Sequence, residues 1–518
     1  MNLDAFLAHY GVNQNPFGAE EALHDAIYLK LLDANASGHP DMDKILGKIG
    51  QPSTSVVFGE KGSGKTAIKM QISRKVGEHN KLHPTEKVLL IEYDDLNPLL
   101  DRITKRRQAD LGFKKSSKVS VEQLLDAVRL EDHQDTILSL GTTRIVDAVL
   151  GQTSSSDEKA IPAIDRKKIK RWPKQHRYDL AMLALLYDQP DGGGLANRWR
   201  GLMSKLKLGF TLPVALTWLL GVMGLVLAGG LYSGRFFIDA TDTDRLRLFE
   251  ILAMIALVGS VLAWGMWAWQ KCSLWRRCKS LRREMPAVSR NANDLEVMLR
   301  ELGLAQEGQP WPSAEDGGDE RYQLTQKLLG VLRMLDYTGL MVLVDRVDEP
   351  TLISGQGIRM KQVIWPMLDN KFLQQVGIGF KLLLPIELRH LLRRESSEFF
   401  QEARLDKQNL IDQLSWSGAT LYDLCSQRLN ACRNPDQEPL SLSGLFAPEV
   451  GSKAVIDALD QMHQPRDAFK FMYAVVQEHC KMVPEEAPEY LIPKLTLESV
   501  RRVHAQRVQE LQRGLSPS

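Results

Sequence analysis

The chain has 518 residues, of which 44% are hydrophobic and 25% charged, and its formal net charge is +2. This composition excludes an intrinsically disordered protein, and the near balance of charge excludes a surface that attracts nucleic acid everywhere. The length is enough for about two to four domains.

The N-terminus does not read as a secretory signal, because residues 1–18 lack a basic start followed by an apolar run. Residues 15–17, Asn-Pro-Phe, are typical of a turn before a helix. The five cysteines include no CxxC pair and show no zinc-ligand spacing, which predicts reduced thiols in a cytosolic compartment.

Residues 55–66 predict a strand, a glycine-rich loop and the start of a helix, and the loop matches GxxxxGK[ST] at every fixed position. Glycines let backbone N–H groups converge on phosphate oxygens, and the positive end of the following helix points at the same anion. The pattern predicts a nucleoside triphosphate site, most simply for ATP, in which Lys65 reaches the β- and γ-phosphates and the Thr66 hydroxyl ligates Mg²⁺. The loop consists of Gly59, Glu60, Lys61, Gly62, Ser63, Gly64, Lys65 and Thr66.

The segment after the loop helix begins with a predicted strand, residues 88–93, which ends at Asp94 and Asp95. Residues 96–195 are polar and predict helices, with basic stretches at 103–118 and 165–177. These stretches fit a solvated helix face, contact with anionic lipid headgroups, or contact with nucleic acid, although no recognised DNA-binding motif accompanies the charge.

Two long uncharged runs, residues 208–234 and 251–270, predict a pair of membrane-spanning helices. A helix needs about 20 apolar residues to cross a hydrocarbon core of about 30 Å. Basic residues precede the first run and follow the second, whereas the connecting loop, residues 235–250, carries three basic and four acidic residues. The positive-inside rule therefore predicts that both outer flanks lie in the cytoplasm, so that the two ends of the chain can build one domain.

A short apolar run after the two predicted spans, residues 341–344, predicts a central parallel strand that ends at Asp345. Ligand groups lie at the carboxyl ends of strands in open α/β sheets, so Asp345 is expected to hold Mg²⁺ directly or through water. Asp348 or Glu349 is expected to orient the attacking water, and the spacing does not choose between them.

The glycine-rich loop, the inserted pair of spans and the acidic motif VLVDRVDE (residues 342–349) follow one another in an order that resembles the KAP-type P-loop NTPases of bacteria. The acidic motif is also similar to that of STAND and AAA+ ATPases. Arg346 departs from the family pattern, which typically has a second acidic residue at that position. The resemblance implies a five-stranded parallel sheet with a helical lid.

The resemblance also implies roles for residues outside the two motifs. Residues 377–384 read as the strand where such ATPases place a γ-phosphate sensor, and residues 414–429 as the entry into the lid. Arg466, after Pro465, resembles the lid arginine that contacts nucleotide, with an ordinary helix start as the alternative. Residues 15–17 resemble a stretch that packs near the adenine. Arg389, Arg393 or Arg394 could be an arginine that senses the γ-phosphate. Each is equally well explained as part of a solvated helix face.

The predicted fold class is α/β: a P-loop NTPase parallel sheet with a helical lid and an inserted two-helix transmembrane hairpin. The predicted segments are an N-terminal part of the ATPase domain (1–95), a helical insert (96–205), the hairpin (206–272), a juxtamembrane helix and loop (273–320), a C-terminal part of the ATPase domain (321–410), and the lid and tail (411–518).

The predicted function is that of an ATPase anchored in a bacterial inner membrane by two spans, with its ATPase domain in the cytoplasm and ATP and Mg²⁺ as ligands. Expected partners are the membrane itself and either further copies of the chain or another protein of the same system. Nucleic acid is a further possible partner, but no sequence feature supports it. By family analogy such proteins act in defence against phage or plasmids. The alternatives are a pore-forming effector controlled by nucleotide and a DNA-handling AAA+ motor recruited to the membrane.

Overall fold

The computed structural model describes residues 1–18, 25–33, 38–110, 120–152, 161–190, 194–208, 214–234, 243–284, 292–302, 320–434 and 437–512. The chain divides into two compact units. The first comprises Met1–Leu100, Ser117–Val128 and Asp336–Ser518, and the second comprises Asp101–Ser116 and Arg129–Leu335.

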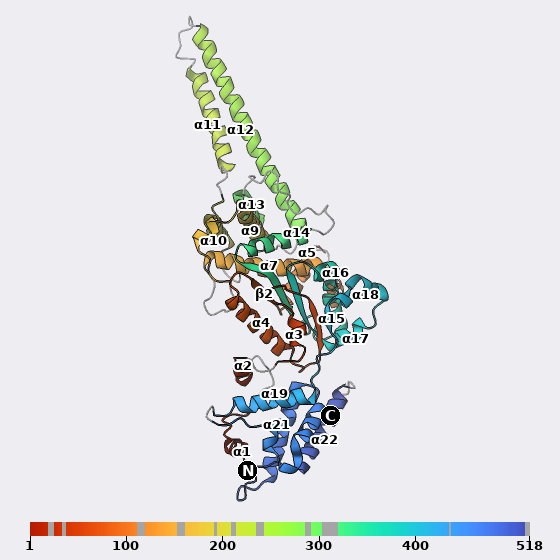
Figure 1. Cartoon of the computed structure of the whole chain (residues 1–518). Helices are drawn as coiled ribbons and strands as arrows, with labels where there is room; N and C mark the ends of the chain where they lie inside the picture. The colour runs from red at the N-terminus through yellow and green to blue at the C-terminus, as the bar shows by residue number, and fades with distance from the viewer. Residues whose placement is uncertain are drawn as a thin grey trace. The chain divides into compact units, whose positions relative to one another are not determined.

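The first unit contains a five-stranded sheet in which every neighbouring pair of strands is parallel, as predicted (Figure 1). The strand order is β2-β3-β4-β1-β5, so β1 lies between β4 and β5 and is separated from β3 by β4. Every residue of β1 and β4 is buried, as expected for apolar strands in the middle of a parallel sheet. The strands are β1 (Ser55–Gly59), β2 (Lys87–Tyr93), β3 (Tyr337–Val344), β4 (Ile378–Pro385) and β5 (Asn409–Ile411).

One face of this sheet is covered by α3 (Met42–Leu46) and α4 (Lys65–Leu82). Ile45, Ile68 and Ile72 of these helices are buried against a layer of strand residues that includes Val57 and Leu383. Between β3 and β4 the chain forms α15 (Gly357–Ile364), a 3₁₀ turn (Trp365–Met367) and α16 (Asn370–Leu373). Between β4 and β5 it forms α17 (Ile386–Leu392), α18 (Ser397–Ala403) and a second 3₁₀ turn (Leu405–Lys407).

Residues from the predicted helical insert also join the first unit. Helix α6 (Val121–Leu125) packs against α15, where Arg359 lies 3.0 Å from Glu122 and the Gln362 amide donates to Asp126 over 2.6 Å. Helix α5 (Asn97–Asp110) contains the boundary between the two units.

A second core in the first unit is entirely helical. The N-terminal helices pack into it together with the C-terminal ones, so residues 1–33 accompany residues 418–512, although the sequence grouped them with the sheet. Apolar side chains such as Phe6 and Leu7 are buried there, and the Tyr10 hydroxyl donates to the carbonyl of Tyr490 over 2.6 Å. We call these helices the lid: α1 (Leu3–His9), α2 (Ala26–Asp33), α19 (Gly418–Ala431), α20 (Gly451–Asp460), α21 (Pro465–Met482) and α22 (Lys494–Gln512), with 3₁₀ turns at Leu442–Leu445 and Pro448–Val450.

All the regular secondary structure described in the second unit is helical. It contains α7 (Leu130–Leu150), α8 (Arg166–Lys170), α9 (Lys174–Tyr187), α10 (Leu195–Leu206), α13 (Ala292–Leu302) and α14 (Glu320–Arg333). Helix α14 lies in this unit, whereas the sequence placed the return to the ATPase domain at residue 321. Buried polar groups join its helices: Asp135 accepts from the Tyr187 hydroxyl over 2.8 Å and from Arg321 over 3.2 Å.

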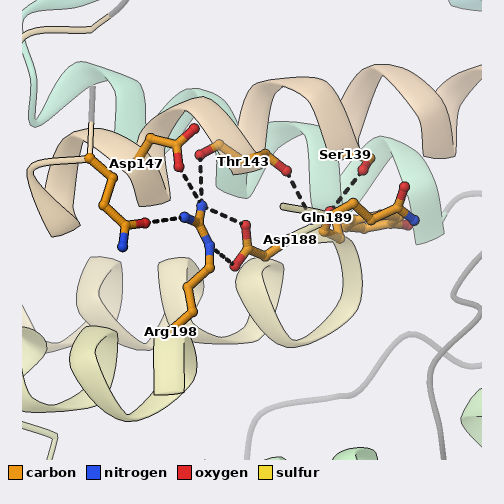
Figure 2. A network of polar contacts seen from close by, with 8 residues as sticks. Ser139, Thr143, Asp147, Asp188, Gln189 and Arg198 are labelled. Atoms are coloured by element: carbon orange, nitrogen blue, oxygen red, sulfur yellow. Dashed lines mark hydrogen bonds and ion pairs between the residues drawn. The ribbon is translucent and has the colours of Figure 1, made fainter. Parts of the chain in front are cut away.

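Arg198 is the centre of a polar network between α7, α10 and the end of α9 (Figure 2). Its guanidinium lies 2.7 Å from both Asp188 and Asp147 and donates to Gln152, and its side chain is only 8% exposed. The sequence treated Arg198 as one of the basic residues flanking the first membrane span. In the structure its charge is instead neutralised by two carboxylates inside the helical bundle.

The two apolar runs form a hairpin of α11 (Val214–Gly234) and α12 (Thr243–Glu284). Two helical stretches, Leu216–Gly234 and Arg247–Arg276, are long and apolar enough to cross a membrane, which suggests membrane association. Their large apolar side chains are exposed, as with Leu227 at 60% and Leu262 at 69%. Residues 209–213 of the first predicted span and residues 235–242 of the connecting loop lie outside the described residues.

Small residues line the contact between the two helices of the hairpin. A Cβ added at Gly224 would lie 3.2 Å from the carbonyl oxygen of Ala256, and the Ser260 hydroxyl donates to the carbonyl of Gly221. Close packing through glycine and serine is typical of helices that associate in lipid, where no hydrophobic effect drives them together.

Candidate functional site

The glycine-rich loop connects β1 directly to α4. Gly62 and Gly64 have φ values of 102° and 96°, a left-handed conformation that favours glycine. A Cβ at Gly62 would also lie 3.0 Å from Gln464 and 3.1 Å from Arg466, so the lid approaches the loop backbone at this point. Gly64 caps α4, whose first N–H groups are therefore free of helical partners and available to an anion.

Lys65 begins α4, and its ammonium group lies over the loop. The Nζ atom donates to the carbonyl of Gly59 over 2.7 Å and to that of Glu60 over 3.0 Å. Burial lowers the pKa of Lys65, and the nearby carboxylates of Asp345, Asp348, Glu387 and Glu60 oppose that shift. The lysine is therefore surrounded by negative charge from three separate parts of the chain.

Asp345 follows the last residue of β3, at the same edge of the sheet as the loop. It is 2% exposed, and its Oδ2 atom has no hydrogen-bond partner among the residues that the structure describes. Burial raises the pKa of Asp345, and the backbone N–H of Arg346 together with Lys69, Lys65 and Arg346 opposes that shift. A buried, unpartnered carboxylate oxygen beside a cation is the arrangement that a divalent metal ion would complete.

The charged residues around Asp345 differ in solvent exposure and in the groups they contact. Arg346 has a φ of 56°, a left-handed conformation for a residue with a side chain, and it lies 3.6 Å from Glu349. The Glu349 side chain is 59% exposed. Asp348 is half-buried and acts on the charge of Lys65, as does Glu387 in the first turn of α17.

A single cavity of about 1210 Å³ joins these groups. Of the predicted loop residues, the three predicted carboxylates and Arg466, all line it except Gly59 and Ser63. The lining residues that the sequence predicted are Glu60, Lys61, Gly62, Gly64, Lys65, Thr66, Asp345, Asp348, Glu349 and Arg466. The structure therefore brings together three stretches that are widely separated in the sequence.

Three residues that lie next to the lid helices or in the segment leading to α19 contact the loop, and the sequence did not predict these contacts. Gln464, the residue before α21, and Gln413, which follows β5, both donate to the Glu60 carboxylate. The indole N–H of Trp416 donates to the carbonyl of Ser63 over 2.9 Å. No sequence motif marks these residues, since each contact depends on how the lid folds back over the loop.

Arg466 and Glu387 extend the set of charged groups around the cavity. Arg466 lies in the first turn of α21, and its Nε atom is buried without a hydrogen-bond partner in the described part of the chain. Glu387 could have been found from the sequence, because it is an acidic residue just after a predicted strand. The register between β1 and β4 pairs Gly59 with Pro385, which brings the start of α17 to the loop.

Other predicted residues lie away from the main cavity. Arg389 donates to the carbonyl of Asp412 and to Gln413, and Arg393 donates to the Asp412 carboxylate; neither these two nor Arg394 lines the cavity. The predicted turn at residues 15–17 follows α1, and Phe17 is buried in the lid core. The main cavity continues instead along aromatic and apolar residues: Tyr28, Leu31, His39, Pro40, Met42, Trp416 and Phe469.

The strand end at Asp94 forms an ion-pair cluster beside the loop helix. Lys69, one turn after Lys65, pairs with Asp94 and lies 3.8 Å from Glu92. Burial is the largest single effect and raises the pKa of Asp94. The hydrogen bond and charge of Lys69, a backbone hydrogen bond and the charge of Arg346 together outweigh it, so the pKa lies below its ordinary value. The cluster supports α4 from the β2 side of the sheet.

Comparison of the chain with protein-family models, with curated proteins and with solved structures found no match.

Proposed function

We propose that the chain is a membrane-associated ATPase with a P-loop NTPase fold, resembling the KAP-type proteins. The observation that carries this proposal is the common cavity: the GxxxxGKT loop, the buried carboxylate of Asp345 and the lid residue Arg466 all line it. Binding pockets are concave and carry convergent polar groups, and this cavity combines charged side chains with aromatic and apolar ones.

The loop would bind the phosphates. Loop residues and the first residues of α4 line the cavity, and Lys65 would exchange its two carbonyl partners for phosphate oxygens. Thr66 and Asp345 would hold Mg²⁺, and this ion would neutralise negative charge on the phosphates. The residues present fit that ion, because the unpartnered Oδ2 of Asp345 and a hydroxyl are hard oxygen ligands.

Asp348 is the better of the two predicted residues for orienting the attacking water. It is half-buried and interacts with the charge of Lys65, whereas Glu349 is 59% exposed and paired with Arg346. Glu387 is a third carboxylate with access to the same cavity. A positioned carboxylate of this kind accepts or directs a proton at the reacting water.

The hairpin would attach this ATPase to a membrane. The exposed apolar side chains of α11 and α12 and the small residues between the helices support insertion into lipid rather than packing inside a soluble core. Basic residues flank the hairpin on both outer sides, and the positive-inside rule then favours a cytoplasmic ATPase domain at the inner membrane of a bacterium. A role in defence against phage or plasmids remains the hypothesis that the KAP resemblance suggests.

Hydrolysis of ATP by the purified full-length chain tests the proposal. Wild type is expected to release phosphate in the presence of Mg²⁺, and Lys65→Ala is expected to abolish turnover, since the lysine is the cation over the loop. Lys61→Ala removes an amino group from a variable position of the same loop and is expected to retain most of the rate. Full activity in Lys65→Ala would overturn the proposed site.

A further inference from the structure

The chain crosses twice between the sheet core and the lid core. Leu31 belongs to the lid core and Met42 to the sheet core, so the first crossing lies between α2 and α3. Leu414 belongs to the sheet core and Leu421 to the lid core, so the second lies between β5 and α19.

The two crossings are bonded to each other through His39. Its Nε2 atom lies 2.9 Å from the carbonyl oxygen of Ser415, and its ring packs edge-on against Trp416 with centroids 4.9 Å apart. The Nδ1 atom accepts the backbone N–H of Asp41 over 3.1 Å. Because Nδ1 is an acceptor, Nε2 carries the hydrogen and donates it to Ser415.

Trp416 joins this crossing point to the glycine-rich loop. Its indole N–H donates to the carbonyl of Ser63 over 2.9 Å, and a Cβ at Gly64 would lie 3.7 Å from its ring. The same ring packs against the lid core. One side chain therefore contacts the loop, the other crossing and the lid.

We propose that Trp416, held by His39, is the positioning residue that couples occupancy of the glycine-rich loop to the arrangement of the lid. This inference rests on the proposed function, since it takes the loop to be the site of ATP. A phosphate bound by the loop backbone shifts the peptide groups around Ser63, and the indole passes that shift to both crossings. Movement of the lid then depends on the Trp416 N–H and not only on packing.

Hydrogen exchange measured by mass spectrometry on the full-length chain, with and without Mg²⁺-ATP, tests the coupling. In wild type, ATP is expected to slow exchange of the amides of α19 and α21. Trp416→Phe keeps an aromatic ring against His39 and the lid but lacks the N–H donor. In this variant ATP is expected still to bind, with the protection of the lid reduced about fivefold, the equivalent of one hydrogen bond.

A matched control is Trp365→Phe, because the indole N–H of Trp365 is buried without an acceptor in the described part of the chain. It is expected to respond to ATP as wild type does. His39→Phe provides a second variant in case Trp416→Phe does not fold, and it is expected to lose lid protection in the same way.

The outcomes separate this inference from the proposed function. Failure of wild type to bind ATP would overturn both. ATP binding with lid protection equal in wild type, Trp416→Phe and His39→Phe, or with no lid response in wild type, would overturn the coupling alone.

Discussion

Asp345 is buried and Lys65 is half-buried, and burial acts on their pKa values in opposite directions. It lowers that of Lys65 and raises that of Asp345, because each loses the solvation of its charged form. Each residue favours the charged form of the other across the site. A polyanion and a divalent cation would provide the missing partners for both, and this complementarity is the physical basis of the proposed nucleotide site.

The water-orienting carboxylate can be identified by amide substitution. Asp348→Asn is expected to lower the rate of ATP hydrolysis by about 10²- to 10⁴-fold, the usual contribution of a positioned acid or base. Glu349→Gln is expected to have little effect, because its side chain is mostly exposed and paired with Arg346. A large loss in Glu349→Gln or Glu387→Gln, with Asp348→Asn active, would reassign the role.

His39 predicts a dependence of stability on pH. Burial lowers the pKa of His39, opposed by its bond to Ser415 and by Asp41 at 3.7 Å, so the folded state binds the proton more weakly than the unfolded state. Stability from the neutral ring is therefore complete above about pH 6.5 and is lost as the pH falls below it, by at most about 1.4 kcal/mol per pH unit.

Thermal unfolding between pH 5 and 7 measures this effect. His39→Gln is expected to flatten the decline in midpoint temperature, since an amide can donate to Ser415 without titrating. An equally steep decline in the variant would show that other groups control the acid sensitivity.

The sequence identified the residues of the site that belong to motifs and missed those that depend on tertiary contacts. Lys65, Thr66 and Asp345 were predicted because loop and strand-end chemistry is local. Trp416 and Gln464 were not, because their bonds to the loop depend on the tertiary fold; Gln464 lies only two residues before the predicted Arg466, but no pattern singled out its own side chain.

At the scale of elements, the central strands were predictable because buried parallel strands are continuous apolar runs. β5 has only three residues, Asn409–Ile411, and was too short to give a pattern. The N-terminal helices were grouped with the sheet because they precede it in the sequence. Their apolar faces are buried in the lid instead, which sequence proximity alone does not indicate.

Helix α10 precedes the hairpin of α11 and α12, and the Arg198 network joins it to α7 (Figure 2). Arg198→Ala would remove the guanidinium that lies 2.7 Å from the carboxylates of both Asp147 and Asp188. The expected cost is about 3 kcal/mol, at the low end for breaking a buried ion pair, and the midpoint temperature should fall by about 6 to 12 °C.

A control on the same helix is Arg200→Ala, because Arg200 is exposed. When both variants are measured in one detergent, Arg200→Ala is expected to leave the midpoint temperature nearly unchanged. Equal midpoints for the two variants would mean that the network does not stabilise the bundle.

At the scale of the whole molecule, the hairpin separates the two halves of the proposed site in the sequence. Lipid insertion of α11 and α12 can be tested with charges at exposed valines, Val226 at 69% and Val258 at 56%. Val226→Arg and Val258→Arg are expected to cost about 3 kcal/mol each at the centre of a membrane helix and to reduce the fraction of chain that remains with membranes after alkaline extraction.

Val503→Arg adds the same charge at a valine of the lid that is 66% exposed, and it is expected to leave membrane retention unchanged. Retention of the doubly substituted hairpin at the wild-type level would argue against insertion of the two helices.

The proposed site requires that the loop at residues 59–66 and Asp345, roughly 280 positions apart in the chain, act on one ligand. Titration calorimetry of ATP binding to the full-length chain, with and without Mg²⁺, tests this most directly when wild type is compared with Asp345→Asn. The account predicts that Mg²⁺ strengthens ATP binding in wild type and that Asp345→Asn loses this effect while still binding ATP. Absence of ATP binding in wild type, or an equal effect of Mg²⁺ in both proteins, would contradict it.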